Sequence, residues 1–283
     1  MRNGYHIIDA HTHIYPDKIA RKAAAHIGEF YDGLGFCGGD VGSLLRLMDE
    51  QGIDLSVVNS AAMTPHQVES INRFLLESAE AHPDRFIPMG TMHPDSTHEE
   101  QERHVQFLTD HHMHGIKIHP DMLAMPLDEP KLRHIYGLCQ EAGLPVLLHT
   151  GDSRYDFTNP NRLEPVVRDF PRLTIIGGHF AGREFYREAA DRLHKYPNLF
   201  ADCSSSFAWL GKDEALYCIR TFTADHIMFG TDHPMFRPGF DLDYLFSLPL
   251  THEELEKILS ETAQKVFGFT APWKKSAETE EKT

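Results

Sequence analysis

The residues with the clearest chemical potential lie in the first apolar segment of the chain, HIIDAHTH at residues 6–13. Alternate side chains of a β-strand point to the same face, so we expect Asp9, His11 and His13 to face one way. Two imidazoles at this spacing can bind one transition-metal ion, and a nearby carboxylate can orient a ring by hydrogen bonding. The same pattern also fits a purely structural pair of histidines, so this segment alone does not decide between the two.

Further polar residues of the same kinds follow later apolar segments, each near the end of its segment. They are His93, Lys117, His119, His149, His179, Asp202, Ser204, Asp232 and His233. A single histidine in such a position is as often a capped core residue as a ligand. Their repetition at several segment ends favours one shared metal site built from several strands.

Short apolar runs alternate along the chain with segments of helical spacing. The predicted strands cover residues 6–13, 55–61, 85–93, 115–120, 144–150, 173–179, 198–205 and 226–234. The predicted helices cover residues 40–51, 64–82, 96–113, 128–143, 160–170, 182–196, 211–224 and 251–268. This alternation predicts a (β/α)8 or TIM barrel, whose chemistry lies at the C-terminal ends of the strands. An open doubly wound sheet is the alternative, but no glycine-rich dinucleotide turn follows any strand.

The domain organisation predicted from this alternation is a single barrel over residues 1–270. Residues 271–283 are polar and are expected to form a disordered tail. Residues 14–39 end in DGLGFCGG and are predicted to be an irregular, glycine-rich excursion after the first strand, folded over the barrel as a lid.

The composition limits the classes of function. The formal net charge of −15 over 283 residues argues against nucleic acids and anionic membranes as partners. The four cysteines, Cys37, Cys139, Cys203 and Cys218, lack metal or redox spacing and are expected to be reduced. No signal peptide or membrane-length apolar run is present in the sequence, so we expect a cytoplasmic protein. Barrels of this type often pair, which is compatible with a homodimer, but no stretch identifies an interface.

Taken in order, these motifs resemble the amidohydrolase superfamily. The similarity lies closest to its amidohydrolase-related branch, which contains both hydrolases and decarboxylases of the aminocarboxymuconate-semialdehyde type. The resemblance spans the first strand to the last helix. It is carried by DAHTH at 9–13, GIKIHP at 115–120, His149 in LLHTG, His179 in GGHF and Asp232 in FGTDHP.

The resemblance implies roles for individual residues. His11, His13, His149 and Asp232 match the ligands of a divalent transition metal, for which we expect zinc first, with manganese, iron or cobalt also compatible. Asp232 would also move the proton of a metal-activated water, and His179 would polarise the substrate. Lys117 matches a strand-four lysine that bridges two metals when it is carboxylated. We expect one metal and an unmodified Lys117 that binds substrate.

Asp9, Lys117, His119, Arg154 and Trp209 complete the candidate site as substrate-binding or ligand-orienting residues. The function expected first is hydrolysis of an amide, ester or lactone of a small organic acid. The alternative is non-oxidative decarboxylation, or hydration, of an unsaturated or aromatic acid at the same metal site. An inactive binding protein would have broken ligand positions, and these positions are intact, so we rank it last.

Overall fold

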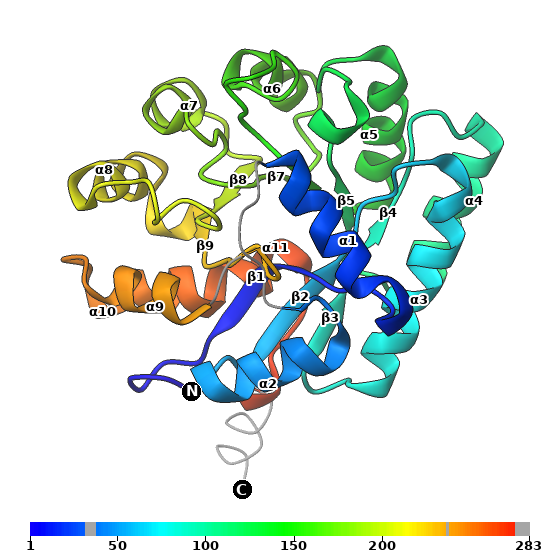
Figure 1. Ribbon diagram of the computed structural model, residues 1–283. Coiled ribbons are helices and arrows are strands. Elements are labelled where there is room, and N and C mark those ends of the chain that lie inside the picture. Colours follow the sequence, from blue (N-terminus) through cyan, green and yellow to red (C-terminus); the bar gives the residue numbers. More distant parts are fainter. Residues whose placement is uncertain (32–37, 236–237, 275–283) are drawn as a thin grey trace, which may run out of the picture.

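The computed structural model describes residues 1–31, 38–235 and 238–274. Within these ranges short parallel strands form a central sheet with helices around it (Figure 1). The strands are β1 (Ile8–His13), β2 (Leu55–Asn59), β3 (Phe86–Pro88), β4 (Gly90–Thr91), β5 (Ile116–Ile118), β6 (Val146–Leu148), β7 (Ile175–Gly177), β8 (Leu199–Asp202) and β9 (Ile227–Met228). The helices are α1 (Asp17–Phe30), α2 (Val41–Gln51), α3 (Val68–Ala81), α4 (His98–Asp110), α5 (Pro130–Ala142), α6 (Pro160–Asp169), α7 (Tyr186–Leu193), α8 (Lys212–Phe222), α9 (Pro238–Phe246), α10 (His252–Glu256) and α11 (Thr262–Phe267).

The strands follow chain order around the barrel in two parallel runs, β1 to β3 and β4 to β9. β3 and β4 are one strand that changes neighbour at Met89. The Met89 amide donates to Val58 on one side, and the next amide, that of Gly90, donates to Gly115 on the other. The two runs are therefore parts of one barrel wall, as the sequence predicted.

Backbone hydrogen bonds also join the first strand to the segment after the last. Ala10 donates to the Phe229 carbonyl at 2.9 Å, and His13 donates to the His233 carbonyl at 2.7 Å. In return the Asp232 amide donates to the His11 carbonyl at 2.8 Å. Backbone hydrogen bonds therefore place the candidate site residues His11 and His13 of β1 next to Asp232 in the segment after β9.

The barrel interior is filled by apolar side chains that point inward from alternate strand positions. They are Ile8, Ala10, Leu55, Val57, Met89, Leu147, Ile176, Phe200 and Met228. Ala263, Val266 and Phe267 of α11 pack into the same cluster. α11 therefore closes one end of the barrel, and the polar residues at the strand ends remain at the other.

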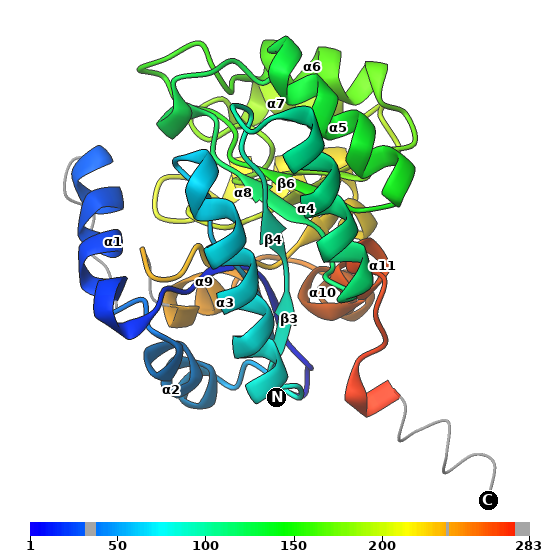
Figure 2. The ribbon, with the colours of Figure 1, turned by 90° about the vertical axis from the view of Figure 1, so that its right-hand side faces the viewer.

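One sequence-based expectation was wrong in the segment after β1. Residues 17–30, predicted to be irregular, form the helix α1. The sequence DKIARKAAAHIGEF is rich in strong helix formers, and its glycine lies near the helix end, so local propensity outweighs the glycine-rich stretch that follows. The expected lid position is nevertheless correct for α1, which lies across the barrel mouth in two perpendicular views (Figures 1 and 2).

Other differences from the prediction are smaller. α9 was not predicted, and most strands are shorter than the apolar runs that contain them. The expected glycine-rich stretch lies mainly in residues 32–37, outside the described residues. Most of the predicted tail is also outside them, although Trp273 is described and stacks on His6 with ring centroids 4.1 Å apart. None of the described helices has the length and apolar character needed to cross a membrane.

The packing of α11 predicts a large cost for truncating its aromatic side chain. Phe267→Ala should lower the free energy of unfolding by about 3–5 kcal/mol, because Phe267 is 3% exposed and fills the end of the barrel. Urea denaturation followed by circular dichroism measures this change. Phe240→Ala is the control, since that side chain is 53% exposed and should cost little. Equal effects of the two variants would contradict the assigned role of α11.

Candidate active site

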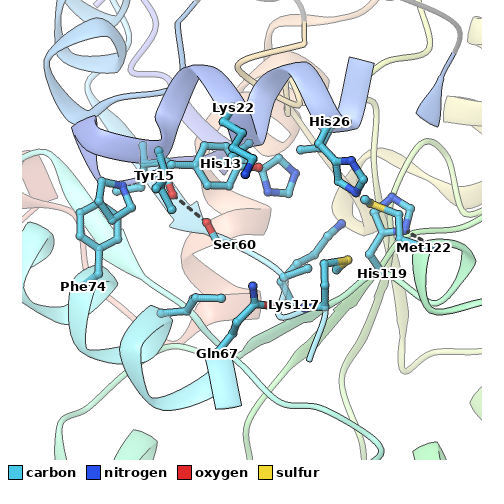
Figure 3. Close-up of a pocket in the computed structure, with 18 of the residues that line it drawn as sticks. His13, Tyr15, Lys22, His26, Ser60, Gln67, Phe74, Lys117, His119 and Met122 are labelled. Carbon is cyan, nitrogen blue, oxygen red and sulfur yellow. Dashed lines mark hydrogen bonds between the residues drawn. The ribbon is translucent and has the colours of Figure 1, made fainter. Parts of the chain in front are cut away.

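A cavity of about 420 Å³ lies between α1 and the strand ends. Its lining is mostly apolar, with Ile14, Ile19, Ile27, Met63, Ile71, Phe74, Met122 and Met235 among the contributing residues. Figure 3 shows Lys22 and His26 pointing from α1 into the cavity, above Lys117 and His119. Polar groups from the strand ends therefore face an apolar chamber roofed by one helix.

The residues expected to bind metal through β1 and the segment after β9 lie together. His11, His13 and Asp232 each offer one donor atom, and these atoms lie within 4.8 Å of one another. His13 Nε2 is 3.0 Å and His11 Nε2 is 3.5 Å from Asp232 Oδ1. Buried imidazole nitrogens converging on a carboxylate oxygen form a donor set that suits a divalent transition metal.

Asp232 is held in its ionised form by its surroundings. Burial alone raises the pKa of this carboxyl, but the imidazoles of His11, His13 and His179 outweigh burial and hold the pKa well below its usual range. Ser205 also donates to Asp232 Oδ2 at 2.6 Å. Asp232 has a φ of +60°, a region rarely adopted by non-glycine residues and often found at functional sites.

Asp202, at the end of β8, orients the His11 ring by a hydrogen bond to Nδ1, the ring nitrogen that does not face Asp232. Its Oδ2 accepts a hydrogen bond from His11 Nδ1 at 2.9 Å, which leaves His11 Nε2 facing Asp232. Asp202 is fully buried, and it also accepts hydrogen bonds from Ser204 and from the His179 amide. His11, His179 and Asp202 form a second set of donor atoms within 4.8 Å of one another. The sequence placed Asp202 at a strand end but did not select it, because its partner is 191 residues away.

Asp9, expected to orient a β1 histidine ring, contacts other groups. Its carboxylate accepts hydrogen bonds from the Thr231 hydroxyl at 2.6 Å and the Thr231 amide at 3.0 Å. Burial raises the pKa of Asp9 to about 7. Asp9 thus ties β1 to the residue before Asp232, and the ring-orienting contact is made by Asp202.

His149 and His179 lie beside each other at the ends of β6 and β7. The distance between His149 Nδ1 and His179 Nε2 is 3.0 Å. His149 Nε2 is 2.9 Å from the Tyr31 hydroxyl, which is also 3.0 Å from His119 Nε2. Burial lowers the pKa of His179 to about 4 and those of His119 and His149 well below the usual range.

The predicted ligand His149 therefore borders the His11, His13 and Asp232 group but is not within its 4.8 Å limit among the described residues. It lines the same cavity as His13 and Asp232. Tyr31, at the C-terminal end of α1, was not selected from the sequence because it lies in a segment expected to be irregular.

Lys117 is a cationic residue in contact with one of the proposed ligands, His11. The side chain is 1% exposed, and its ammonium donates to His11 Nε2 at 3.0 Å. Burial lowers its pKa to about 8. At neutral pH Lys117 thus carries a buried positive charge at the base of the cavity.

Two arginines beside Tyr31 differ in their partners. Arg154, selected from the sequence, donates to Asp152 at 2.6 and 2.9 Å, so its charge is already paired. The Arg183 guanidinium lies 4.8 Å from the Tyr31 ring and 5.2 Å from the Trp209 ring. Its buried Nε has no hydrogen-bond partner among the described residues. Arg183 is therefore the better candidate for binding an anion, with half-exposed Trp209 as its support.

A protein-family model matches most of the chain. The model described as "Amidohydrolase" matches residues 8–269. This chain belongs to the amidohydrolase family. The relationship expected from the ordered histidine and aspartate motifs is thus confirmed, whereas no match was found among curated proteins.

Solved structures share the fold. An uncharacterized TIM-barrel protein from Bordetella bronchiseptica is 24% identical, with a TM-score of 0.78 over 93% of this chain and 98% of that one. A 5-carboxyvanillate decarboxylase from Sphingomonas paucimobilis is 15% identical, with a TM-score of 0.73 over 94% and 100%. A dihydroxybenzoic acid decarboxylase from Polaromonas, with bound manganese and the inhibitor 2-nitroresorcinol, is 18% identical, with a TM-score of 0.72 over 93% and 97%. These similarities confirm the predicted TIM-barrel fold.

A buried carboxylate on α9 predicts how stability depends on pH. Burial, with Asp9 and Asp232 nearby, raises the pKa of Asp241 from 3.8 to about 8. The folded state then keeps a proton that the unfolded state loses above about pH 4, so stability falls as pH rises from about 4 to 8. Asp241→Asn removes this loss and should raise the melting temperature more at pH 7.5 than at pH 4.5.

The control is Asp243→Asn on the same helix, where the side chain is 72% exposed. That variant should shift the melting temperature little at either pH. A stabilisation by Asp241→Asn that is the same at both pH values would show that the buried Asp241 is ionised in the folded protein.

Proposed function

We propose that the chain is a divalent-metal-dependent decarboxylase that acts on an unsaturated or aromatic carboxylic acid. The observation that carries this proposal is the charge distribution in the cavity. Lys22 and Lys117 contribute positive charge to an otherwise mainly apolar lining, and Asp232 is the one carboxylate among the described lining residues. Such a chamber suits an apolar, ring-sized body that carries a carboxylate.

The proposed metal ligands are His11, His13, His149 and Asp232. The donor types fit a transition metal, and Asp202 supplies the outer carboxylate that fixes the His11 ring. A bound ion would act as a Lewis acid that neutralises negative charge on the substrate. We propose manganese ahead of zinc, because the Polaromonas decarboxylase of the same fold contains manganese.

The reaction places specific demands on the protein. The bond between the carboxylate carbon and the organic fragment breaks, CO2 leaves, and the electron pair stays on the fragment until a proton replaces CO2. Lys117 is protonated at neutral pH, lines the cavity and lies beside His11, so it can stabilise this charge and supply the proton. The apolar walls exclude water, which strengthens these electrostatic interactions.

From the sequence alone, hydrolysis was the reaction expected first. We now place decarboxylation ahead of it. Two of the three solved structures compared above are decarboxylases of aromatic acids, and they cover nearly the whole chain. An ionised Asp232 could also serve as the base for a hydrolytic water. The product therefore distinguishes the two reactions.

The deciding experiment measures CO2 release from a panel of hydroxybenzoates and unsaturated acids by protein loaded with Mn²⁺. Wild type should release CO2, whereas chelator-treated protein and Asp232→Asn should lose at least about 10³-fold in kcat, because the ligand set and its central charge are disrupted. Circular dichroism should show that the variant keeps the fold. Hydrolysis of esters or lactones without CO2 release from any acid would reject the decarboxylase proposal in favour of a hydrolase.

Arg183 gives a second prediction for the same substrates. Arg183→Gln should raise KM by about 10-fold or more while the metal content stays unchanged, because a charge-assisted hydrogen bond to a carboxylate is lost. The matched control is Arg187→Gln, because the Arg187 guanidinium also stacks on a tyrosine ring, that of Tyr217, but Arg187 is exposed on α7. An unchanged KM for Arg183→Gln would remove this residue from substrate binding.

A further inference from the structure

The hydroxyl of Tyr31 connects the roof of the cavity to its base. Tyr31 follows α1 directly and lines the cavity. Its oxygen lies 2.9 Å from His149 Nε2 and 3.0 Å from His119 Nε2, and the two imidazole rings are stacked 4.0 Å apart. One phenol thus bridges two buried histidines from neighbouring strand ends.

Hydrogen bonds link Ser204, His179, His149 and Tyr31 in a chain. The direction of each bond can be deduced by starting at the buried Ser204. His179 Nδ1 is 3.0 Å from both the carbonyl and the hydroxyl oxygen of Ser204, and that hydroxyl donates its own proton to Asp202. Both Ser204 oxygens can only accept, so His179 Nδ1 carries the proton. In a neutral ring the other nitrogen is then an acceptor, and His149 Nδ1 must donate to His179 Nε2.

The same reasoning continues to Tyr31. Because His149 Nδ1 carries the proton, His149 Nε2 has a free lone pair, and Tyr31 must donate its O–H to it. The Tyr31 oxygen then accepts from His119 Nε2. His119 Nδ1 must consequently be an acceptor, and the Met122 amide donates to it at 3.4 Å. The independent contact at Met122 agrees with the deduced directions.

This hydrogen-bond chain has a consequence for His149. A metal ligand needs an unprotonated nitrogen, and the chain from Ser204 through His179 leaves Nε2 of His149 in that form, facing the cavity. The lone pair is already used by the Tyr31 hydroxyl. One lone pair cannot serve both the phenol proton and a metal ion.

We propose that Tyr31 is a positioning residue that competes with the metal for His149 Nε2, so that metal binding releases the C-terminal end of α1 from the barrel mouth. This inference rests on the metal site of the proposed function and extends it to the lid. The ring of Tyr31 also contacts the Arg183 and Arg154 guanidiniums at 4.8 and 5.2 Å, so its release would uncover both.

The test compares wild type, Tyr31→Phe and the control Tyr155→Phe, each freed of metal and titrated with Mn²⁺ by calorimetry. Tyr31→Phe keeps the ring that contacts the arginines and loses only the competing hydroxyl. It should bind Mn²⁺ about three- to tenfold more tightly, the effect expected from one hydrogen bond. Tyr155 also lies under Arg154 and near Phe30, but its side chain is exposed and it is not part of the hydrogen-bond chain through His149, so Tyr155→Phe should match wild type.

Hydrogen exchange of residues 17–30 gives a second readout that does not depend on activity. In wild type, Mn²⁺ should accelerate exchange near the C-terminal end of α1, whereas in Tyr31→Phe exchange should be fast with or without Mn²⁺. Equal or weaker Mn²⁺ binding by Tyr31→Phe, no Mn²⁺ binding by either protein, or wild-type exchange that Mn²⁺ does not alter would each overturn the competition. A shift in Mn²⁺ affinity without CO2 release from any acid would support the competition and reject only the decarboxylase.

Discussion

The candidate site depends on the backbone hydrogen bonds that join β1 to the segment after β9. His13 Nε2 and Asp232 Oδ1 are 3.0 Å apart although 219 residues separate them. Two backbone bonds, between Asp232 and His11 and between His13 and His233, fix the carboxylate beside the imidazoles. Asp9 reinforces the same junction through Thr231. Closing the barrel and assembling the proposed metal ligands are therefore one structural event.

Burying so many polar groups at one end of the barrel is costly unless they satisfy one another. The structure solves this with linked contacts. Asp202 accepts from His11, Ser204 and His179, and Lys117 donates to His11. The His11 ring is thereby held in one orientation and one tautomer, because Asp202 contacts its Nδ1 and Lys117 contacts its Nε2. The apolar interior and α11 provide stability at the opposite end, so the two requirements are separated along the barrel axis.

The sequence predicted the barrel and the set of residues at its mouth because both follow from local patterns. Apolar runs define strands, and the ends of parallel strands meet at one face whatever their order. The sequence could not assign pairwise contacts. Asp9 and Asp202 both end up near His11, yet only the three-dimensional structure shows that Asp202 contacts the ring and Asp9 contacts Thr231. Likewise the sequence singled out Arg154, and only the structure shows that Asp152 already pairs with Arg154 whereas the buried Arg183 Nε has no hydrogen-bond partner among the described residues.

The position of α1 has a consequence for how this protein can change over evolutionary time. The roof of the cavity comes largely from one contiguous helix, whereas the ligand-type residues come from strand ends that are locked into the barrel wall. Substitutions at Ile19, Lys22, Ala23, His26 or Ile27 alter the chamber without touching a barrel strand. Substitutions at a few positions of α1 can therefore change which substrates fit the cavity, while the ligand-type residues at the strand ends stay unchanged.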